Sequence, residues 1–136
     1  MTDSPRYFGT DARAQEASGS GSFVQWDTLD AIEMVPGLFF QPVVGDGVMA
    51  NFVRFEPHTE APVHWHEEEQ ISFVVEGELE FEVAGETRLL TRGQAVVIPP
   101  NVPHGARTHD GPCFEVDVFH PPRRALLETM GSAEPA

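Results

Sequence analysis

The segment His64-Trp65-His66-Glu67-Glu68-Glu69-Gln70, with His104 further along the chain, carries the most structural information in this sequence. If residues 63–66 form a strand, His64 and His66 point to one face about 6.6 Å apart along it, and both imidazoles can reach one metal ion. Gln70 on the same straight strand would lie about 13 Å beyond His66, which is too far to join them. The acidic run 67–69 must therefore turn the chain, so that Gln70 opens the next strand beside the histidines. This spacing predicts a hairpin built around a metal.

Composition and charge limit the classes of function. With 136 residues the chain is expected to form one domain that buries roughly two-thirds of the surface its unfolded form exposes. It has 22 acidic residues against eight arginines and no lysine, and the formal net charge is -14. This charge repels nucleic acid and anionic lipid, so neither is an expected partner. The absence of lysine excludes Schiff-base chemistry and leaves arginine, protonated histidine or metal as the positive charge of a site.

Cysteine content and hydropathy bear on the compartment. The single cysteine, Cys113, cannot form an internal disulfide, and no apolar run is long enough to span a bilayer or to act as a signal peptide. A soluble cytoplasmic protein is the simplest interpretation.

Three segments of unequal length are expected: a flexible tail over 1–22 that ends in a Ser/Gly run, a β-domain over 23–121, and a short helix with a tail over 122–136. Within the β-domain, short β-rich runs are separated by turn residues every eight to twelve positions, the pattern of an all-β sandwich or barrel. The expected strands are 37–44, 48–55, 63–66, 70–75, 78–83, 87–90, 95–98, 104–108 and 113–119. After Pro121-Pro122, residues 123–130 are expected to form a short helix.

Alternation of polar and apolar residues shows which strand faces meet water. The carboxylates of Glu78, Glu80 and Glu82 share one face, and a solvated outer face explains them better than a cation site. In the run 113–119, Glu115, Asp117 and Phe119 share one face and Phe114, Val116 and Val118 the other. From periodicity alone, the acidic face could meet water or line the mouth of a barrel. Cys113 is expected to be a packing residue.

Two motifs in the chain resemble those of the cupin family. The first runs from His64 through His66 and Gln70 to Gly77, with Gln70 where most members have glutamate. The second runs from Gly93 through Pro99-Pro100-Asn101 to His104. Asn101 replaces a glycine and can adopt the same left-handed turn conformation. The resemblance implies an all-β, single-domain fold, the cupin double-stranded β-barrel or jelly roll, and a homodimer.

A narrower resemblance is to KdgF-type cupins, which open 4,5-unsaturated monouronates from pectin and alginate to the linear 4-deoxy-5-keto form. It implies that the metal ligands are His64, His66, Gln70 and His104. It also implies that Asp117, Phe119 and Arg123 are the catalytic residues beyond the metal, and this favours the inward orientation of Asp117.

The donor set itself predicts the type of chemistry. Three neutral imidazoles and one amide oxygen leave the full dipositive charge on an ion, which favours Lewis-acid chemistry over redox cycling. The expected ion is zinc, nickel, manganese or iron(II), because imidazole suits all four. A non-redox isomerase or lyase that acts on a small sugar acid is therefore the favoured function. The alternatives are an oxygen-dependent dioxygenase, another small-molecule lyase or a polyketide cyclase, and a non-catalytic cupin that only binds a small ligand.

Overall fold

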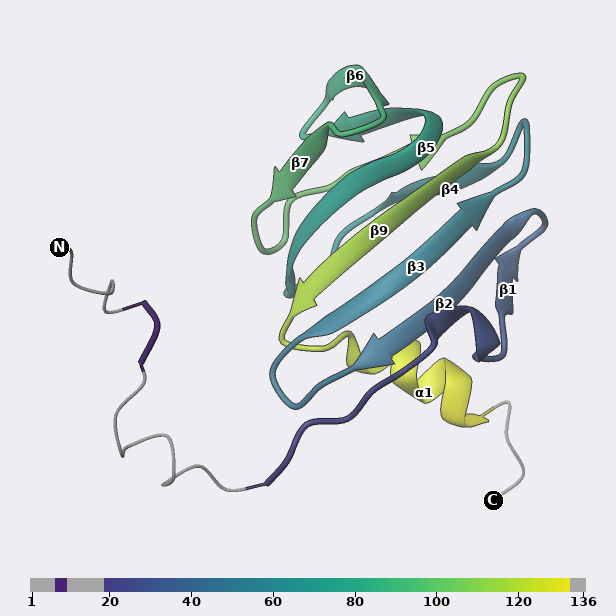
Figure 1. The fold of residues 1–136 in the computed structure, drawn as a ribbon. Helices are drawn as coiled ribbons and strands as arrows, with labels where there is room; N and C mark the ends of the chain where they lie inside the picture. The colour runs from purple at the N-terminus through teal and green to yellow at the C-terminus, as the bar shows by residue number, and fades with distance from the viewer. Residues whose placement is uncertain (1–6, 10–18, 133–136) are drawn as a thin grey trace, which may run out of the picture.

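A computed structural model describes residues 7–9 and 19–132 of the chain, so most of the expected N-terminal tail lies outside the described residues. The described part is mainly strand, with a short helix near its C-terminal end (Figure 1). The elements are the 3-10 turn η2 (Trp26–Thr28), β1 (Ile32–Val35), β2 (Leu38–Val44), β3 (Met49–Phe55), β4 (Glu60–His64), β5 (Glu69–Val83), β6 (Glu86–Thr91), β7 (Ala95–Ile98), β8 (His104–Arg107), β9 (Cys113–His120) and α1 (Arg124–Ser132).

The strands form an antiparallel sheet that curls into a nearly closed barrel, a single-domain jelly roll as predicted. One side is built from β1, β2, β3, β9, the first half of β5 and β7. The second half of β5 pairs with β6 and β8, and β8 pairs with β4 on the other side. Strand β5 therefore runs across both sides and joins them (Figure 1).

The long strand β5 corrects the expectation of two strands, 70–75 and 78–83, separated by a turn. The residues Glu76-Gly77 do not reverse the chain; they form a bulge, where the register against β9 shifts between Val74 and Glu76. Gly77 has φ +84° at this point, and an added Cβ would lie 2.2 Å from the carbonyl oxygen of Pro112. The bulge bends β5, which lets one strand belong to both sides of the barrel.

The expected hairpin around the metal is also wrong. Strand β4 ends at His64, one residue short of the Trp65-His66 pair, and it pairs with β8, not with β5. The turn at 67–68 carries the chain from one side of the barrel to the other. His64 and Gln70 consequently line one interior cavity, while His104 lies directly opposite His64 in the β4–β8 register.

Apolar side chains fill the barrel, as the alternation along the strands predicts. Leu79 and Phe81 are buried on the inner face of β5, and they join a cluster with Leu38, Val53 and Phe55. The outward carboxylate of Glu80 instead meets Arg107 at 3.3 Å and His109 at 2.9 Å. The expected outer face is therefore present, and Glu80 on it is paired with neighbours on the surface.

The segment before the first strand covers part of the outer face of the barrel. The indole of Trp26 stacks on Phe52 at 4.5 Å and on Phe114 at 5.2 Å between ring centroids. Strand β1, which the sequence pattern did not predict, then pairs with β2 at the edge of the sheet.

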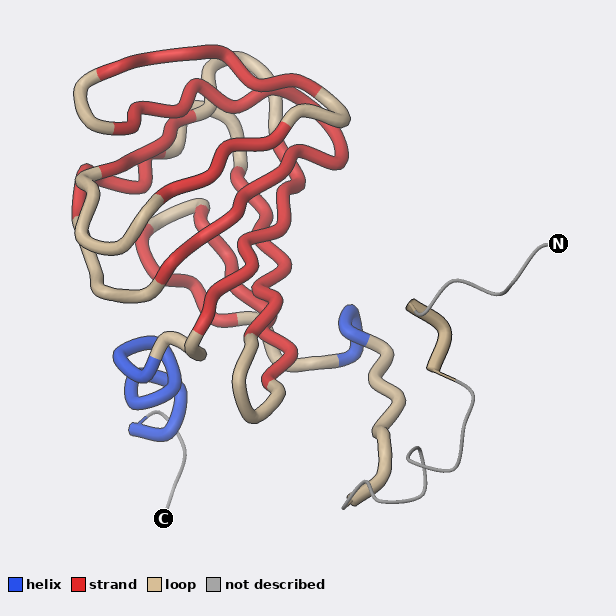
Figure 2. The backbone as a smooth tube through the Cα atoms, turned by 90° about the vertical axis from the view of Figure 1, so that its left-hand side faces the viewer, coloured by secondary structure: helices blue, strands red, loops and turns tan. Residues whose placement is uncertain are grey.

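Helix α1 packs against the end of the barrel at which β9 ends and β5 begins (Figure 2). Its Leu126 is buried against Met49 and Phe119. The helix spans nearly the residues expected and brings the preceding Arg123 to the mouth of the interior cavity. No helix in the described ranges has the length and apolar character needed to span a bilayer.

Candidate metal centre

Three histidines from distant parts of the chain converge inside the barrel. His64 ends β4, His66 lies in the following turn and His104 begins β8. Their candidate ligand nitrogens all lie within 4.8 Å of one another. The centroids of the His64 and His104 rings are 4.4 Å apart, and those of His66 and His104 are 4.9 Å apart. Nitrogens at these separations can reach one common ion.

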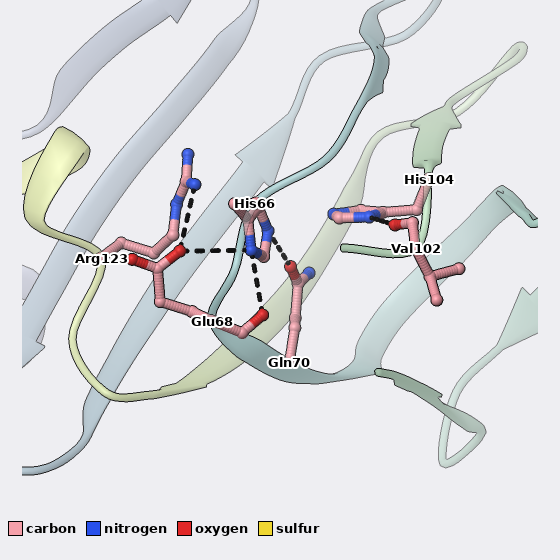
Figure 3. Close-up of polar contacts among 6 residues, drawn as sticks. All are labelled: His66, Glu68, Gln70, Val102, His104 and Arg123. Atoms are coloured by element: carbon pink, nitrogen blue, oxygen red, sulfur yellow. Dashed lines mark hydrogen bonds and ion pairs between the residues drawn. The ribbon is translucent and has the colours of Figure 1, made fainter. Parts of the chain in front are cut away.

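Backbone carbonyls fix the orientation of all three rings. The Nδ1 atoms of His64, His66 and His104 lie 2.8, 3.0 and 2.9 Å from the carbonyl oxygens of Pro62, Glu68 and Val102, respectively. Figure 3 shows two of these contacts. A carbonyl oxygen only accepts, so each Nδ1 carries the hydrogen and each Nε2 presents a lone pair. The buried Nε2 of His104 has no hydrogen-bond partner, which fits a metal-binding nitrogen.

Gln70 presents its amide oxygen to the same point. Its Nε2 donates to Ser72 Oγ at 2.7 Å, which turns Oε1 toward His66 Nε2 at 3.0 Å (Figure 3). Both facing atoms carry lone pairs, so their approach is unfavourable unless a cation lies beside them. Bonds of about 2.1 Å at right angles place two ligand atoms about 3.0 Å apart, so this contact fits an octahedral metal ion. The expected proximity of Gln70 to the histidines is confirmed, and its role as a ligand stays a prediction.

Burial keeps the imidazoles of His66 and His104 in the form that binds metal. Loss of solvation, with a contribution from the charge of Arg123, lowers the pKa of His66 below its usual range. Loss of solvation also lowers the pKa of His104 to about 4, and the neighbouring His64 and His66 act in the same direction. Neutral imidazole is the metal-binding form, so these rings need lose no proton near neutral pH.

The second cupin-like motif helps to hold the candidate metal centre in place. Asn101 has φ +66°, the left-handed conformation expected where the family has glycine. Its backbone N–H donates to the carbonyl oxygen of His66 at 2.7 Å. This hydrogen bond fixes the turn that carries His66 beside the loop that leads to His104.

The donor set lies on one wall of a cavity of about 160 Å³. Apolar side chains, including those of Phe40, Phe55 and Phe81, line much of the remainder. Asp117 and Phe119 point into the same space and are 8% and 5% exposed, so the acidic face of β9 turns inward, as the resemblance implied. Asp117 accepts a hydrogen bond from Ser72 Oγ at 2.5 Å. The thiol of Cys113 lies in the core, and burial raises its pKa to about 12, which agrees with a packing role.

Arg123 lies at the mouth of the cavity and is held there by a residue that sequence reasoning missed. Its Nη1 is 3.5 Å from Glu68 Oε1 (Figure 3), and its guanidinium lies 5.9 Å from the centre of the Phe119 ring. Glu68 Oε1 is also 3.4 Å from His66 Nδ1. Glu68 is buried, whereas Glu67 and Glu69 on either side of it are exposed. Nothing in a run of three identical residues marks the middle one for this role.

Ser72 and Glu115 also line or adjoin the site, and sequence analysis assigned a role to neither of them. Ser72 is directly opposite Asp117 in the β5–β9 register. Glu115 is 3% exposed, and its Oε1 has no hydrogen-bond partner. Burial and the charge of Asp117 raise the pKa of Glu115 well above its usual range.

Comparison with known proteins agrees with this geometry. The family model described as "Cupin domain" matches residues 51–119, half of the chain. The structure of KdgF from Halomonas sp. is 32% identical with a TM-score of 0.74, over 79% of this chain and 99% of that one. A RmlC-like cupin from Shewanella frigidimarina is 31% identical with a TM-score of 0.73, over 79% and 96% of the two chains.

A curated relative adds a second kind of activity. The H2HPP isomerase of Bacillus subtilis is 45% identical over 82 residues, which are 58% of this chain and 34% of the relative. The chain thus matches about a third of the length of that protein. The fold, the convergent histidines and these similarities lead to one conclusion: the chain belongs to the cupin family, as a small single-domain member that is similar to KdgF.

Proposed function

We propose that this protein is a metal-dependent, non-redox isomerase that opens 4,5-unsaturated monouronates to their linear 4-deoxy-5-keto form. The observation that carries the proposal is the arrangement of one cavity: the donor set His64, His66, Gln70 and His104 on one wall, with Asp117 and Arg123 facing the same space. The similarity to KdgF from Halomonas over nearly the whole of that chain supports this substrate class.

The donor set suits a divalent ion, and zinc, nickel, manganese and iron(II) are the candidates. His64, His66, His104 and Gln70 would hold the ion, which when bound supplies a Lewis acid that polarises an oxygen of the substrate. These four residues carry no negative charge when the imidazoles are neutral, so they leave the charge of the ion uncompensated.

Arg123 is the residue that binds the substrate carboxylate in this proposal. A guanidinium presents two parallel N–H donors that match the two oxygens of a carboxylate. Its contact with Glu68 and its position over Phe119 hold it at the cavity mouth before the substrate arrives. Phe119 forms one wall of the cavity and fixes the plane in which the sugar ring lies.

Asp117 moves the proton. In the ring opening, the anomeric hydroxyl loses its proton, the bond between C1 and the ring oxygen breaks, and the enolate left at C5 gains a proton at C4. No atom is gained or lost, so one carboxylate that accepts the first proton and returns it at C4 satisfies the balance. The position of Asp117 on the inner face of β9 leaves it exposed to the cavity and to nothing else.

The direct test is to incubate metal-replete protein with unsaturated monogalacturonate and follow the loss of the conjugated absorbance. Asp117→Asn should lower turnover by about 100-fold or more while the metal content stays intact, because the amide cannot accept the proton. Asp110→Asn, which changes a fully exposed carboxylate, is the matched control and should behave as wild type. An unchanged rate in Asp117→Asn would remove this residue from the mechanism. Oxygen uptake during turnover would favour a dioxygenase instead.

A second candidate follows from the curated relative. The 45% identity to H2HPP isomerase over 82 residues favours a related isomerisation of a different small molecule. The same cavity and the same proton-transfer residue would serve it. Assay of the purified protein with both substrates separates the two, and the substrate with the higher kcat/KM decides between them.

Assembly and location complete the proposal. A homodimer is expected, because Ile71, Phe73, Val75 and Val97 leave an exposed apolar patch on the outer face of β5 and β7. The cytoplasm is the expected location. Small molecules are the expected partners, and the net charge of -14 disfavours nucleic acid.

A further inference from the structure

Asp117 is engaged by hydrogen-bonding residues on two sides. Ser72 Oγ, on the neighbouring strand β5, donates to Asp117 Oδ1 at 2.5 Å and accepts from Gln70 Nε2 at 2.7 Å. Glu115, two residues earlier on the same inward face of β9, is buried beside Asp117. Both Glu115 and Asp117 face the cavity. A chain of hydrogen bonds thus runs from Asp117 through Ser72 to Gln70, beside the metal centre, and Glu115 lies next to its Asp117 end.

The chemistry of these groups determines which one donates and which one accepts in each hydrogen bond. The amide nitrogen of Gln70 can only donate, so Ser72 accepts from it and gives its single hydrogen to Asp117. Asp117 is therefore the acceptor at one side. Two carboxyl groups can hydrogen-bond only when one of them carries a proton, and Asp117 already accepts from Ser72, so Glu115 is the group placed to donate.

The surroundings of Glu115 also favour a proton on Glu115. Its register neighbours on β3 and β5 are Val53 and Val74, whose side chains carry neither a charge nor a hydrogen-bond donor. The titratable groups that act on Glu115 are Asp117 and Cys113, both on β9, and neither is a cation. Glu115 is 3% exposed, so an ionised carboxylate there would be neither hydrated nor paired.

We propose that Glu115 is a positioning residue that carries the proton of the Glu115–Asp117 pair and donates it in a hydrogen bond to Asp117. Ser72 and Glu115 then both donate to Asp117, and Ser72 also aims the amide oxygen of Gln70 at the metal centre. This inference rests on the proposed function in one respect, the role of Asp117 in proton transfer. Its consequence there is that Asp117 begins the reaction as the base.

Variants of Glu115 test the donor role. Glu115→Gln keeps a donor of the same shape, and kcat should stay within about 3-fold of wild type. Glu115→Leu has no donor, and kcat should fall about 10- to 100-fold, the range for loss of a hydrogen bond to a charged group. The melting temperature of Glu115→Leu should not fall, because leucine suits the apolar wall and removes a buried oxygen that has no partner. A residue with a merely structural role would lose activity and stability together.

A variant of Ser72 tests the part of the hydrogen-bond chain that reaches Gln70. Ser72→Ala frees the amide of Gln70 to rotate, and the Kd for zinc, measured by competition with a chromophoric chelator, should rise about 10-fold or more. Glu78→Gln is the matched control, since Glu78 is an exposed carboxylate on the outer face of the same strand, and it should leave activity and zinc affinity unchanged.

A measurement that needs no substrate separates this inference from the proposed function. Zinc-loaded protein with ¹³C-labelled glutamate side-chain carboxyls should give one resonance at pH 7 with the chemical shift of a neutral acid, and that resonance should be absent from Glu115→Gln. A carboxylate shift for Glu115 at pH 7 overturns the inference whatever the enzyme turns over. Equal loss of kcat in Glu115→Gln and Glu115→Leu, or wild-type kcat in both, also overturns it. A neutral Glu115 in a protein inactive on unsaturated uronates would instead reject only the proposed function.

Discussion

Neutral histidines at the candidate metal centre make the metal-free protein sensitive to acid. The pKa of His104 is about 4 in the folded chain, against an ordinary value of 6.5. Between these two pH values the unfolded chain binds more protons at this residue than the folded chain does, so the free energy of unfolding rises with pH across the window. The stability is fully present above pH 6.5 and is lost as the pH falls toward 4.

We therefore expect metal-free protein to lose on the order of 3 kcal/mol of unfolding free energy through His104 when the pH falls from 6.5 to 4. Urea unfolding in the presence of a chelator, at a series of pH values, measures this loss as the difference between wild type and His104→Leu. Glu115 acts in the opposite direction, because a carboxyl with a raised pKa binds its proton more tightly in the folded chain. The subtraction of the variant cancels that contribution.

The exposed His58 provides the control for this experiment, since its side chain is 69% exposed. His58→Gln should reproduce the wild-type dependence on pH. Parallel curves for wild type and His104→Leu would contradict the assignment of the effect to His104.

Single residues differ in how far the sequence reveals their place. The convergence of His64, His66 and His104 was predictable because the spacing of metal ligands leaves a pattern in the chain. Ser72 leaves none, because it matters through Asp117, which sequence order does not bring near. Glu115 leaves none, because its role depends on burial beside Asp117, and periodicity alone does not decide which face of β9 is buried. The inward orientation of Asp117 lies between these cases: period two gave its face, and only the resemblance favoured the interior.

At the scale of elements, strand β5 depends on its bulge at Gly77. A Cβ at this position would lie 2.2 Å from the carbonyl oxygen of Pro112, on the backbone of the loop that leads into β9. Gly85, in the turn before β6, has almost the same φ, +82°, but no heavy atom within 4 Å of an added Cβ. The two glycines therefore share the conformational requirement and differ in the space around them.

Gly85→Ala should cost about 1 kcal/mol of unfolding free energy, the penalty of the left-handed conformation alone. Gly77→Ala adds a clash with backbone that cannot move aside without shifting β9, and it should cost at least about 2 kcal/mol more. Chemical denaturation of both variants measures the difference. Equal costs for the two substitutions would show that β9 yields easily and that the bulge does not constrain the barrel.

The elements that sequence analysis placed correctly are those with a regular alternation and a turn at each end, such as β3, β7 and β9. It failed where pairing decides the outcome. Nothing local distinguishes a bulge at Glu76-Gly77 from a turn, and nothing in the turn after His66 indicates that β4 pairs with β8 instead of β5. Strand β1 was missed because it is short and lies at the edge of the sheet, where packing imposes little pattern.

At the scale of the whole molecule, the apolar patch of Ile71, Phe73, Val75 and Val97 is unusual for a chain with a net charge of -14. Ile71 and Val97 are direct register partners on β5 and β7, so their side chains form one continuous surface. A twofold dimer places the same patch of two copies face to face, which buries apolar area while the acidic surfaces stay apart. The patch therefore suits a second copy of this chain better than a charged partner.

Light scattering coupled to size exclusion should accordingly give twice the 15.0 kDa mass of the chain. Val97→Glu, at a side chain that is 57% exposed, should shift the protein toward the monomer, because each dimer would then bring two unpaired carboxylates into an apolar contact. Val63→Glu is the matched control, since Val63 is 50% exposed but lies on β4, which pairs with β8 on the other side of the barrel. If both substitutions dissociate the dimer equally, or if the wild type is monomeric at high concentration, the patch is not the interface. If Val97→Glu alone gives a monomer that still turns over substrate, each barrel holds a complete site.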